Sequence, residues 1–317
     1  MADLDKRKVL VTGSSGFIGL HLVRHLHEAG ASVTRLQRRL TDDGTGTRCI
    51  VTDDLSARSL DAAFAQVRPD VVFHLAGYGI APGNRDLELM RALNISASEA
   101  VVTAAAQHGV LTVVATGSGS EYDFAGCTAP VDETHATLTT AMLSDPKHAY
   151  GASKAEGGRK ALARARDMGL GYVHARLFNT YGPGEGAHRL LPSLHSSLRR
   201  GERVKLSAGT QMRDFMHVGD TCTALTALAL ASVDKPRAMA VNVATGSPRS
   251  VKEFGLAVAA AMGCAADMLD FGALPLREGE TMFFSGTSDV LQRLTSWRPQ
   301  FSLEAGISDA IRSLDGA

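Results

Sequence analysis

The chain has 317 residues, which is enough for one large domain or two modest domains with a buried core. Its 33 Lys and Arg residues balance 33 Asp and Glu residues, so no net charge draws it to nucleic acid or a membrane surface, and a small-molecule partner is expected. The lack of a signal-peptide pattern, of a membrane-spanning apolar stretch and of any Cys-x-x-Cys pair predicts a cytoplasmic protein without disulfides or a metal site.

The first thirty residues predict a strand, a glycine-rich turn and a helix. Residues 9–11 form a short apolar run, and apolar residues return at helical spacing over 17–26. The turn between them has the spacing G-x-x-G-x-x-G. Backbone N–H groups converge at such a turn and the helix dipole favours an anion, so we expect a dinucleotide pyrophosphate there. The residues expected to line it are Gly13, Ser15, Gly16, Phe17, Ile18 and Gly19.

The second predicted strand, residues 32–36, leads to the site that selects the cofactor. NAD enzymes commonly place a carboxylate after this strand for the ribose 2′-hydroxyl, whereas NADP enzymes use arginine for the 2′-phosphate. Here Gln37 is followed by Arg38 and Arg39, whose guanidinium groups would bind a phosphate. The pattern favours NADP(H) over NAD(H), with a solvated basic turn as the structural alternative.

Strands and helices continue to alternate along the first half of the chain. Residues 49–51, 71–75 and 111–115 read as further strands, separated by helices over 60–67 and about 87–108. This alternation predicts right-handed crossovers and a parallel α/β sheet covered on both faces. His74, inside an apolar strand, is expected to be a core residue. Further residues expected at the cofactor are Asp54, Leu55, Leu75, Ala76, Gly77 and Thr116.

Candidate catalytic residues follow the fifth strand. Ser118 comes at the strand's carboxyl end, where open α/β sheets bind ligands. Tyr150 and Lys154 are four residues apart and share one face of a predicted helix. A nearby ammonium is expected to lower the phenol pKa from about 10, which would make Tyr150 a general acid or base. A Tyr-x-x-x-Lys pair is common by chance. The stronger indication is the order along the chain of the glycine turn, the alternating strands and helices, the hydroxyl-rich strand end and this helix.

Sequence motifs in one consistent order extend over nearly the whole chain. They are TGSSGFIG (12–19), FHLAG (73–77), ATGSGSEY (115–122), YGASK (150–154), RLFNTYGPGEG (176–186), QMRDFMHVGD (211–220), VNVATG (241–246), REGE (277–280) and WRP (297–299). With these motifs the chain resembles an extended short-chain dehydrogenase/reductase of the nucleotide-sugar branch, the NAD-dependent epimerase/dehydratase family.

The resemblance implies a role for each matching residue. Ser118, Tyr150 and Lys154 would be the catalytic set, with Tyr150 as proton donor and Lys154 on the nicotinamide ribose. Asn94, on the long helix, would support this set and contribute to the cofactor site. The residues implied to bind a nucleotide-diphosphate sugar are Asn179, Arg213 and Arg277. Planar guanidinium groups suit diphosphate oxygens. For Arg213, the alternative is an ion pair with Asp214 or Asp220.

Departures from the family pattern reduce the number of reactions that the sequence favours. Dehydratases place acidic residues directly after the catalytic hydroxyl, but here Gly119 and Ser120 occupy those positions and the carboxylate comes only at Glu121. Gln37 argues against an NAD-dependent epimerase. The resemblance therefore favours NADPH-dependent reduction of a nucleotide-diphosphate 4-keto(-6-deoxy) sugar. An NAD-dependent 4-epimerase is the alternative, and a non-catalytic dinucleotide sensor is the third reading.

The expected architecture is a doubly wound Rossmann fold with a smaller C-terminal substrate domain. Residues 1–176 would form the dinucleotide-binding domain, to which the chain returns at about 215–243. Residues 177–214 and 244–317 would bind the substrate, with the active site in the cleft between. The alanine-rich faces of the helices over 94–107 and 150–166 suit packing between subunits, so a homodimer is expected.

Overall fold

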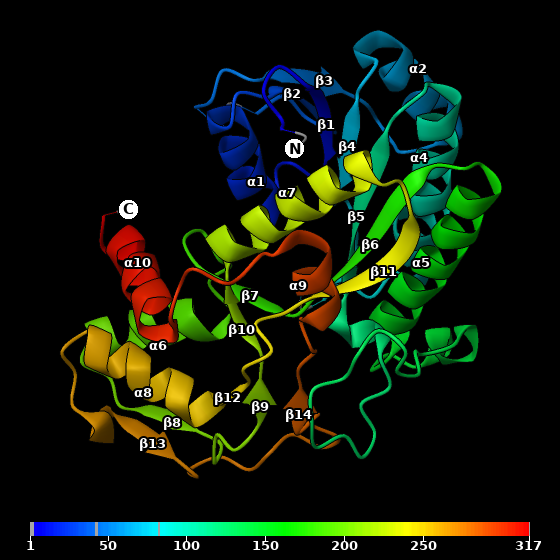
Figure 1. Ribbon diagram of the computed structural model, residues 1–317. Coiled ribbons are helices and arrows are strands. Elements are labelled where there is room, and N and C mark those ends of the chain that lie inside the picture. Colours follow the sequence, from blue (N-terminus) through cyan, green and yellow to red (C-terminus); the bar gives the residue numbers. More distant parts are fainter. Residues whose placement is uncertain (1–2, 42–43, 82, 317) are drawn as a thin grey trace.

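Seven parallel strands form the central sheet of the computed structural model, which describes residues 3–41, 44–81 and 83–316 (Figure 1). The order across the sheet is β3-β2-β1-β4-β5-β6-β11, so strand addition reverses between β1 and β4. Ligands bind at such a switch point, outside the carboxyl ends of the strands. This order confirms the predicted doubly wound α/β fold. The strands are β1 (Lys8–Thr12), β2 (Ser32–Gln37), β3 (Arg48–Val51), β4 (Val71–His74), β5 (Thr112–Ser118), β6 (Gly171–Leu177) and β11 (Ala238–Val243).

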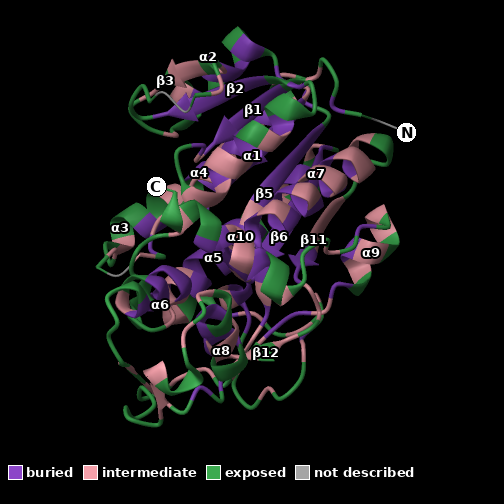
Figure 2. Cartoon of the chain, turned by 90° about the vertical axis from the view of Figure 1, so that its left-hand side faces the viewer, coloured by how far each residue is buried: buried purple, intermediate pink, exposed green. Residues whose placement is uncertain are grey.

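Helices cover both faces of the sheet. In β1, Val9 and Val11 pack towards one helical layer and Leu10 towards the other, because side chains alternate along a strand. Figure 2 shows buried strands between helices whose outer faces are exposed. The first layer contains α1 (Phe17–Glu28), α7 (Val218–Asp234) and α9 (Asp289–Thr295), and the second contains α2 (Ala57–Val67), α4 (Ala97–Gln107) and α5 (Ala149–Asp167).

A single wider turn interrupts the long helix that the sequence predicts over 87–108. α3 (Leu87–Met90) continues through a π-helical turn at Arg91–Ser96 into α4. Asn94 lies in this turn, and α5 packs so closely that a Cβ on Gly157 would overlap the carbonyl oxygen of Asn94. Turns of this kind are rare and frequently lie at functional sites. Gly157 therefore sets how near α5 approaches the turn that carries Asn94.

Replacement of Gly157 by alanine is expected to destabilise the fold by about 1–3 kcal/mol, the usual cost of overpacking. The added methyl group has no room because the atom that it meets belongs to the backbone. Urea unfolding measures the loss. Lys160→Ala on the exposed face of the same helix is the control and should change stability by less than about 0.5 kcal/mol. Equal stability of wild type and Gly157→Ala would contradict the prediction.

Several alanines of α4 and α5 pack inside the subunit. Ala104, Ala105, Ala161 and Ala165 are all buried in the core cluster between these helices and the sheet. Ala100 and Ala106 on α4 are half-buried and Ala163 on α5 is exposed, so alanines also lie on the outward faces of these helices. Homodimerisation through these faces stays a prediction.

A separate hydrophobic cluster lies below the sheet in Figure 1 and joins distant parts of the second half of the chain. Its elements are α6 (Leu190–Arg199), α8 (Val251–Ala261), α10 (Leu303–Asp315) and the paired strands β8 (Val204–Leu206) and β13 (Leu269–Phe271). Two further groups of short strands are β7 (Asn179–Tyr181) with β10 (Phe215–His217), and β9 (Met212–Arg213) with β12 (Arg249–Ser250) and β14 (Phe283–Phe284). Among the described residues, no helix has both the length and the apolar character needed to cross a membrane.

Candidate active site

The glycine turn after β1 brings the start of α1 close to the backbone of the sheet. Gly13 has a φ of +69°, and a Cβ there would lie 2.5 Å from backbone atoms of Leu75 and Ala76. A Cβ on Gly19 would overlap the carbonyl oxygen of Gly13, so a larger residue would push the helix away. α1 begins without a side-chain cap, which leaves its first N–H groups for an anion. This cradle fits a dinucleotide pyrophosphate.

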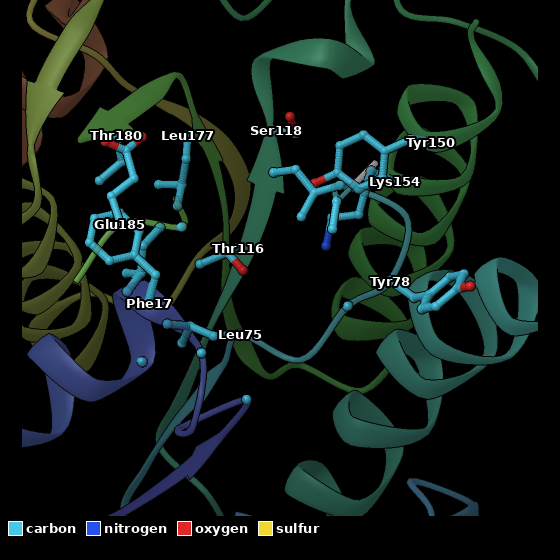
Figure 3. A pocket seen from close by; sticks show the side chains of 18 of the residues that line it. Phe17, Leu75, Tyr78, Thr116, Ser118, Tyr150, Lys154, Leu177, Thr180 and Glu185 are labelled. Carbon is cyan, nitrogen blue, oxygen red and sulfur yellow. The ribbon is translucent and has the colours of Figure 1, made fainter. Parts of the chain in front are cut away.

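A cavity of about 430 Å³ extends from this turn to the carboxyl ends of the central strands (Figure 3). The predicted residues on its walls are Gly13, Gly16, Phe17, Ile18, Gly19, Leu75, Gly77, Thr116, Ser118, Tyr150 and Lys154. Sequence reasoning missed Tyr78, Leu177, Phe178, Thr180, Glu185, His188 and Arg189, which also line it. Most of these residues lie in loops after strands, where no periodicity marks which side chains face inward.

Ser118, Tyr150 and Lys154 meet at one end of this cavity. β5 extends to Ser118, three residues beyond the predicted strand, so Ser118 occupies the last strand position. Tyr150 and Lys154 lie one turn apart at the start of α5, and Figure 3 shows the Tyr150 hydroxyl directed towards β5. Ser118 Oγ accepts a hydrogen bond from the Ser120 N–H (3.1 Å), and its hydroxyl is also hydrogen-bonded to Tyr150. A hydroxyl, a phenol and an ammonium thus share one wall, as proton transfer to a bound carbonyl requires.

Burial controls the protonation of this set. Loss of water raises the pKa of Tyr150 to about 12, although the hydrogen bond with Ser118 and the charge of Arg189 lower it. Burial also lowers the pKa of Lys154, and the charge of Glu121 opposes that shift. The predicted lowering of the Tyr150 pKa by Lys154 is therefore wrong, because desolvation of the phenolate outweighs the nearby cations and the cation that acts on it is Arg189. Tyr150 is a neutral phenol at working pH.

Asn94 supports the cavity from behind rather than lining it. Its side chain is 1% exposed and binds the Tyr78 backbone twice, accepting from the N–H (2.9 Å) and donating to the carbonyl oxygen (2.8 Å). It also donates to Ser153 Oγ on α5 (2.8 Å). Asn94 therefore connects the loop after β4 with the helix that carries Tyr150.

Three further predicted cofactor residues, Ala76, Asp54 and Leu55, lie away from the cavity wall. The backbone of Ala76 packs against the glycine turn. The Asp54 carboxylate accepts hydrogen bonds from the Ser56 N–H (3.0 Å) and Ser59 Oγ (2.6 Å), and thereby stabilises the start of α2. Leu55 packs against the core beneath that helix. His74 is a core residue as expected, with Nδ1 bonded to Thr12 Oγ1 (2.7 Å).

A second hollow of about 420 Å³ lies at the carboxyl end of β2. Its lining residues are Ser15, Gln37, Arg38, Arg39 and Thr41. Gln37 is buried and its amide is held in place, donating to Ser14 Oγ (2.9 Å) and accepting from Thr41 Oγ1 (2.8 Å). Arg38 and Arg39 are exposed at its edge. The hollow combines a neutral amide with two cations beside the first turn of α1.

The predicted substrate residues also come together. Asn179, Arg213 and Arg277 line one hollow of about 360 Å³, although 98 residues of sequence separate the first from the last. Asn179 also lines a hollow of about 260 Å³ with Ser118 and Tyr150. Asn179 therefore connects the candidate catalytic set with the two arginines.

Arg213 has a different partner from those considered in the sequence. Its guanidinium donates to Glu280 Oε1 at 2.8 Å. Asp214 instead accepts hydrogen bonds from Thr245 and Gly246, and Asp220 accepts from two backbone N–H groups after α9. The alternative of an ion pair with Asp214 or Asp220 is therefore wrong. The guanidinium remains on the wall of the hollow, paired with a carboxylate from another segment.

A family model matches most of the chain. The model of the NAD dependent epimerase/dehydratase family covers residues 9–244, from β1 to just past β11. The chain belongs to the NAD-dependent epimerase/dehydratase family. Membership confirms the predicted resemblance, and makes this epimerase/dehydratase homologue an NAD(P)-dependent enzyme of the extended short-chain dehydrogenase/reductase type.

Relatives of this epimerase/dehydratase homologue catalyse different reactions. A dTDP-4-dehydro-6-deoxy-D-allose reductase from Streptomyces bikiniensis is 30% identical over 276 residues, which cover 81% of this chain and 82% of that protein. A UDP-glucose 4-epimerase from Mycolicibacterium smegmatis is 26% identical, with 96% and 97% covered. The solved structure of MoeE5 in complex with UDP-glucuronic acid and NAD is 31% identical, with a TM-score of 0.81 and 98% and 99% covered. The family thus includes nucleotide-sugar reductases and epimerases.

Proposed function

We propose that this family member reduces the 4-keto group of a nucleotide-diphosphate sugar, such as a 4-keto-6-deoxyhexose, with NADPH. The observation that carries the proposal is the hollow at the end of β2, where Arg38 and Arg39 stand beside the neutral Gln37. Guanidinium groups attract the 2′-phosphate of NADP(H), whereas a carboxylate at position 37 would repel it. Net reduction draws on NADPH, whereas an epimerase must recycle the cofactor that it holds.

In this proposal, residues of the chain position the carbonyl group and supply the proton. When bound, the dinucleotide supplies the hydride for the carbonyl carbon. Ser118 hydrogen-bonds the carbonyl oxygen, and Tyr150 donates its proton to that oxygen as negative charge develops. Lys154 holds the nicotinamide ribose. Burial raises the pKa of Tyr150, so the phenol keeps its proton until negative charge develops on the carbonyl oxygen.

The sugar nucleotide would lie on the opposite side of Tyr150 from the glycine turn. The sugar would fill the hollow that Asn179 shares with Ser118, and the diphosphate would reach Arg213 and Arg277. This placement assigns residues 1–176 and the return at about 215–243 to the dinucleotide. Residues 177–214 and 244–317 would bind the substrate.

Replacement of Arg38 by alanine is expected to weaken NADP(H) binding about tenfold, the value of one charge-assisted hydrogen bond, and to leave NAD(H) binding unchanged. Titration calorimetry on cofactor-free protein measures both affinities. Arg24→Ala, on the exposed side of α1, is the matched control and should alter neither. Tighter binding of NAD than NADP by the wild type, or NAD retained through purification, would contradict the assignment of NADPH.

A second candidate function is the interconversion of nucleotide sugars at carbon 4. The 31% identity to MoeE5, whose structure holds UDP-glucuronic acid and NAD, favours this alternative. Turnover separates the two. A reductase consumes NADPH in step with a 4-keto sugar nucleotide, whereas an epimerase converts a UDP-sugar without consuming added cofactor. Dinucleotide binding without either reaction would indicate a non-catalytic sensor.

A further inference from the structure

Three cationic side chains line the hollow of about 260 Å³ beside Ser118 and Tyr150, which is called the sugar hollow below. Arg85 lies in the loop after β4, Lys147 lies just before α5, and Arg189 lies just before α6. Among the residues that the structure describes, no Asp or Glu lines this hollow. Three segments far apart in the sequence thus bring positive charge to the place that the proposed function gives to the sugar.

The backbone beside Tyr150 holds Arg85 in place. Its Nη1 donates hydrogen bonds to the carbonyl oxygens of Gly79 (3.3 Å) and Asn84 (3.0 Å). Gly79 in turn packs against the phenol ring, since a Cβ on this glycine would lie 3.2 Å from Tyr150 Cδ2. Both acceptors are neutral, so these bonds fix the position of the guanidinium without cancelling its charge.

Arg189 brings a second guanidinium to the sugar hollow. It is half-buried and lines both this hollow and the dinucleotide cavity. Its Nε donates to Glu185 Oε1 (3.0 Å), a bond that uses one of the five N–H groups of a guanidinium. Its charge also lowers the pKa of Tyr150 against the effect of burial, which agrees with a position near the reacting group.

A substrate diphosphate does not account for these two arginines. The diphosphate is assigned to the hollow of Arg213 and Arg277, and neither Arg85 nor Arg189 is among the described residues that line it. Lys147 lines both hollows and so lies where they meet. A diphosphate bound to Arg213 and Arg277 would thus leave two guanidinium groups of the sugar hollow without an anion from the ligand.

The chemistry of the lining favours a sugar that is itself negatively charged. Lysine and arginine side chains only donate hydrogen bonds, whereas a sugar hydroxyl both donates and accepts. An ionised carboxylate only accepts, and its two oxygens match the planar fork of a guanidinium. A neutral sugar would displace water from the cations without replacing it by an opposite charge, which is unfavourable.

We propose that the keto sugar carries a carboxylate, which Arg85 and Arg189 hold while Lys147 lies between it and the diphosphate. This inference rests on the proposed function and narrows its substrate, because a carboxylate would take the place of the methyl group of a 6-deoxyhexose. That group is attached to carbon 5, the neighbour of the keto carbon. With the carbonyl group at Ser118 and Tyr150, the carboxylate would therefore lie in the same hollow as the arginines.

The test compares two ligands that differ only at this group. UDP-glucuronate has a carboxylate where UDP-glucose has a hydroxymethyl group, and the thymidine forms of both cover a second base. Calorimetry uses protein saturated with reduced dinucleotide, which has no keto group to reduce in either ligand. The wild type should bind the glucuronate at least about tenfold more tightly, the value of one charge-assisted hydrogen bond.

Substitution of Arg85 should remove this preference selectively. Arg85→Gln is expected to reduce it to about threefold or less and to leave the affinity for the glucose ligand unchanged, because one charged donor is lost. Arg85→Lys should retain most of the preference, because it keeps the charge. Arg91→Gln, an exposed arginine that faces Glu88 across 3.8 Å, is the matched control and should keep the wild-type preference.

The double variant Glu185→Gln/Arg189→Gln removes the second guanidinium without leaving a buried carboxylate unpaired, and it should also lower the preference. Equal affinity of the wild type for the two ligands would overturn the proposal. An equal loss of affinity for UDP, UDP-glucose and UDP-glucuronate in Arg85→Gln would also overturn it, since the arginine would then bind the diphosphate. Preference for the carboxylate in a protein that reduces no keto sugar would instead refute only the reductase function, whereas failure of every sugar nucleotide to bind would refute both.

Discussion

Replacement of Tyr150 by phenylalanine is expected to lower kcat about a thousandfold, within the range that general acid–base catalysis supplies. The phenol is the proton donor in the proposed reduction, and a phenyl ring at this position carries no proton to give. The phenyl ring keeps the apolar contacts of the cavity wall, so dinucleotide affinity should stay within about twofold of the wild type.

The control for this variant is Tyr78→Phe. Tyr78 also lines the cavity, but Figure 3 shows its hydroxyl directed away from Ser118, so loss of that hydroxyl should cost far less activity. Steady-state kinetics and calorimetry on both variants provide the comparison. Loss of dinucleotide binding by Tyr150→Phe without a specific loss in kcat would remove Tyr150 from its role as proton donor.

The parts of the site that the sequence predicts are those set by local chemistry. Gly13 has a positive φ, and at Gly19 the helix comes close to the turn after β1, so both positions require glycine. The spacing of these glycines is therefore visible in the sequence. Tyr150 and Lys154 share a helix face because of the helical period alone. The strand–helix alternation likewise determines the parallel sheet, and therefore the edge at which these residues collect.

The parts that the sequence does not predict depend on partners far apart in the chain. In the sequence, Glu121 is notable only because it lies too far after Ser118 to match the acidic residues of a dehydratase. Its partners His174 and Arg176 lie 53 and 55 residues away along the chain. No period connects such positions, so only the pairing of β5 with β6 shows that they meet. The predicted lowering of the Tyr150 pKa is wrong for a related reason. The spacing of Tyr150 and Lys154 reveals the nearby ammonium, but the loss of water that raises the pKa depends on tertiary packing.

Arg213→Ala is expected to raise KM for the sugar nucleotide about a hundredfold and to change kcat little, since a hydrogen bond between charged groups contributes about 1.5–3 kcal/mol to binding. The guanidinium lies on the wall of the hollow with Asn179 and Arg277. Burial lowers its pKa, and the Glu280 carboxylate opposes that shift. Its loss would remove a cation from the diphosphate and leave the Glu280 carboxylate facing two phosphate charges.

A double-mutant cycle separates these two contributions. Glu280→Ala alone frees the guanidinium for the diphosphate, so KM should not rise, and the double variant Arg213→Ala/Glu280→Ala should recover part of the loss because the repelling carboxylate is gone. Arg203→Ala is the control, since that exposed arginine faces Asp270 across 3.8 Å. A fall in kcat with an unchanged KM in Arg213→Ala would place the residue at the reacting sugar. Recovery in the double variant would identify Glu280 as the carboxylate that a bound diphosphate displaces from Arg213.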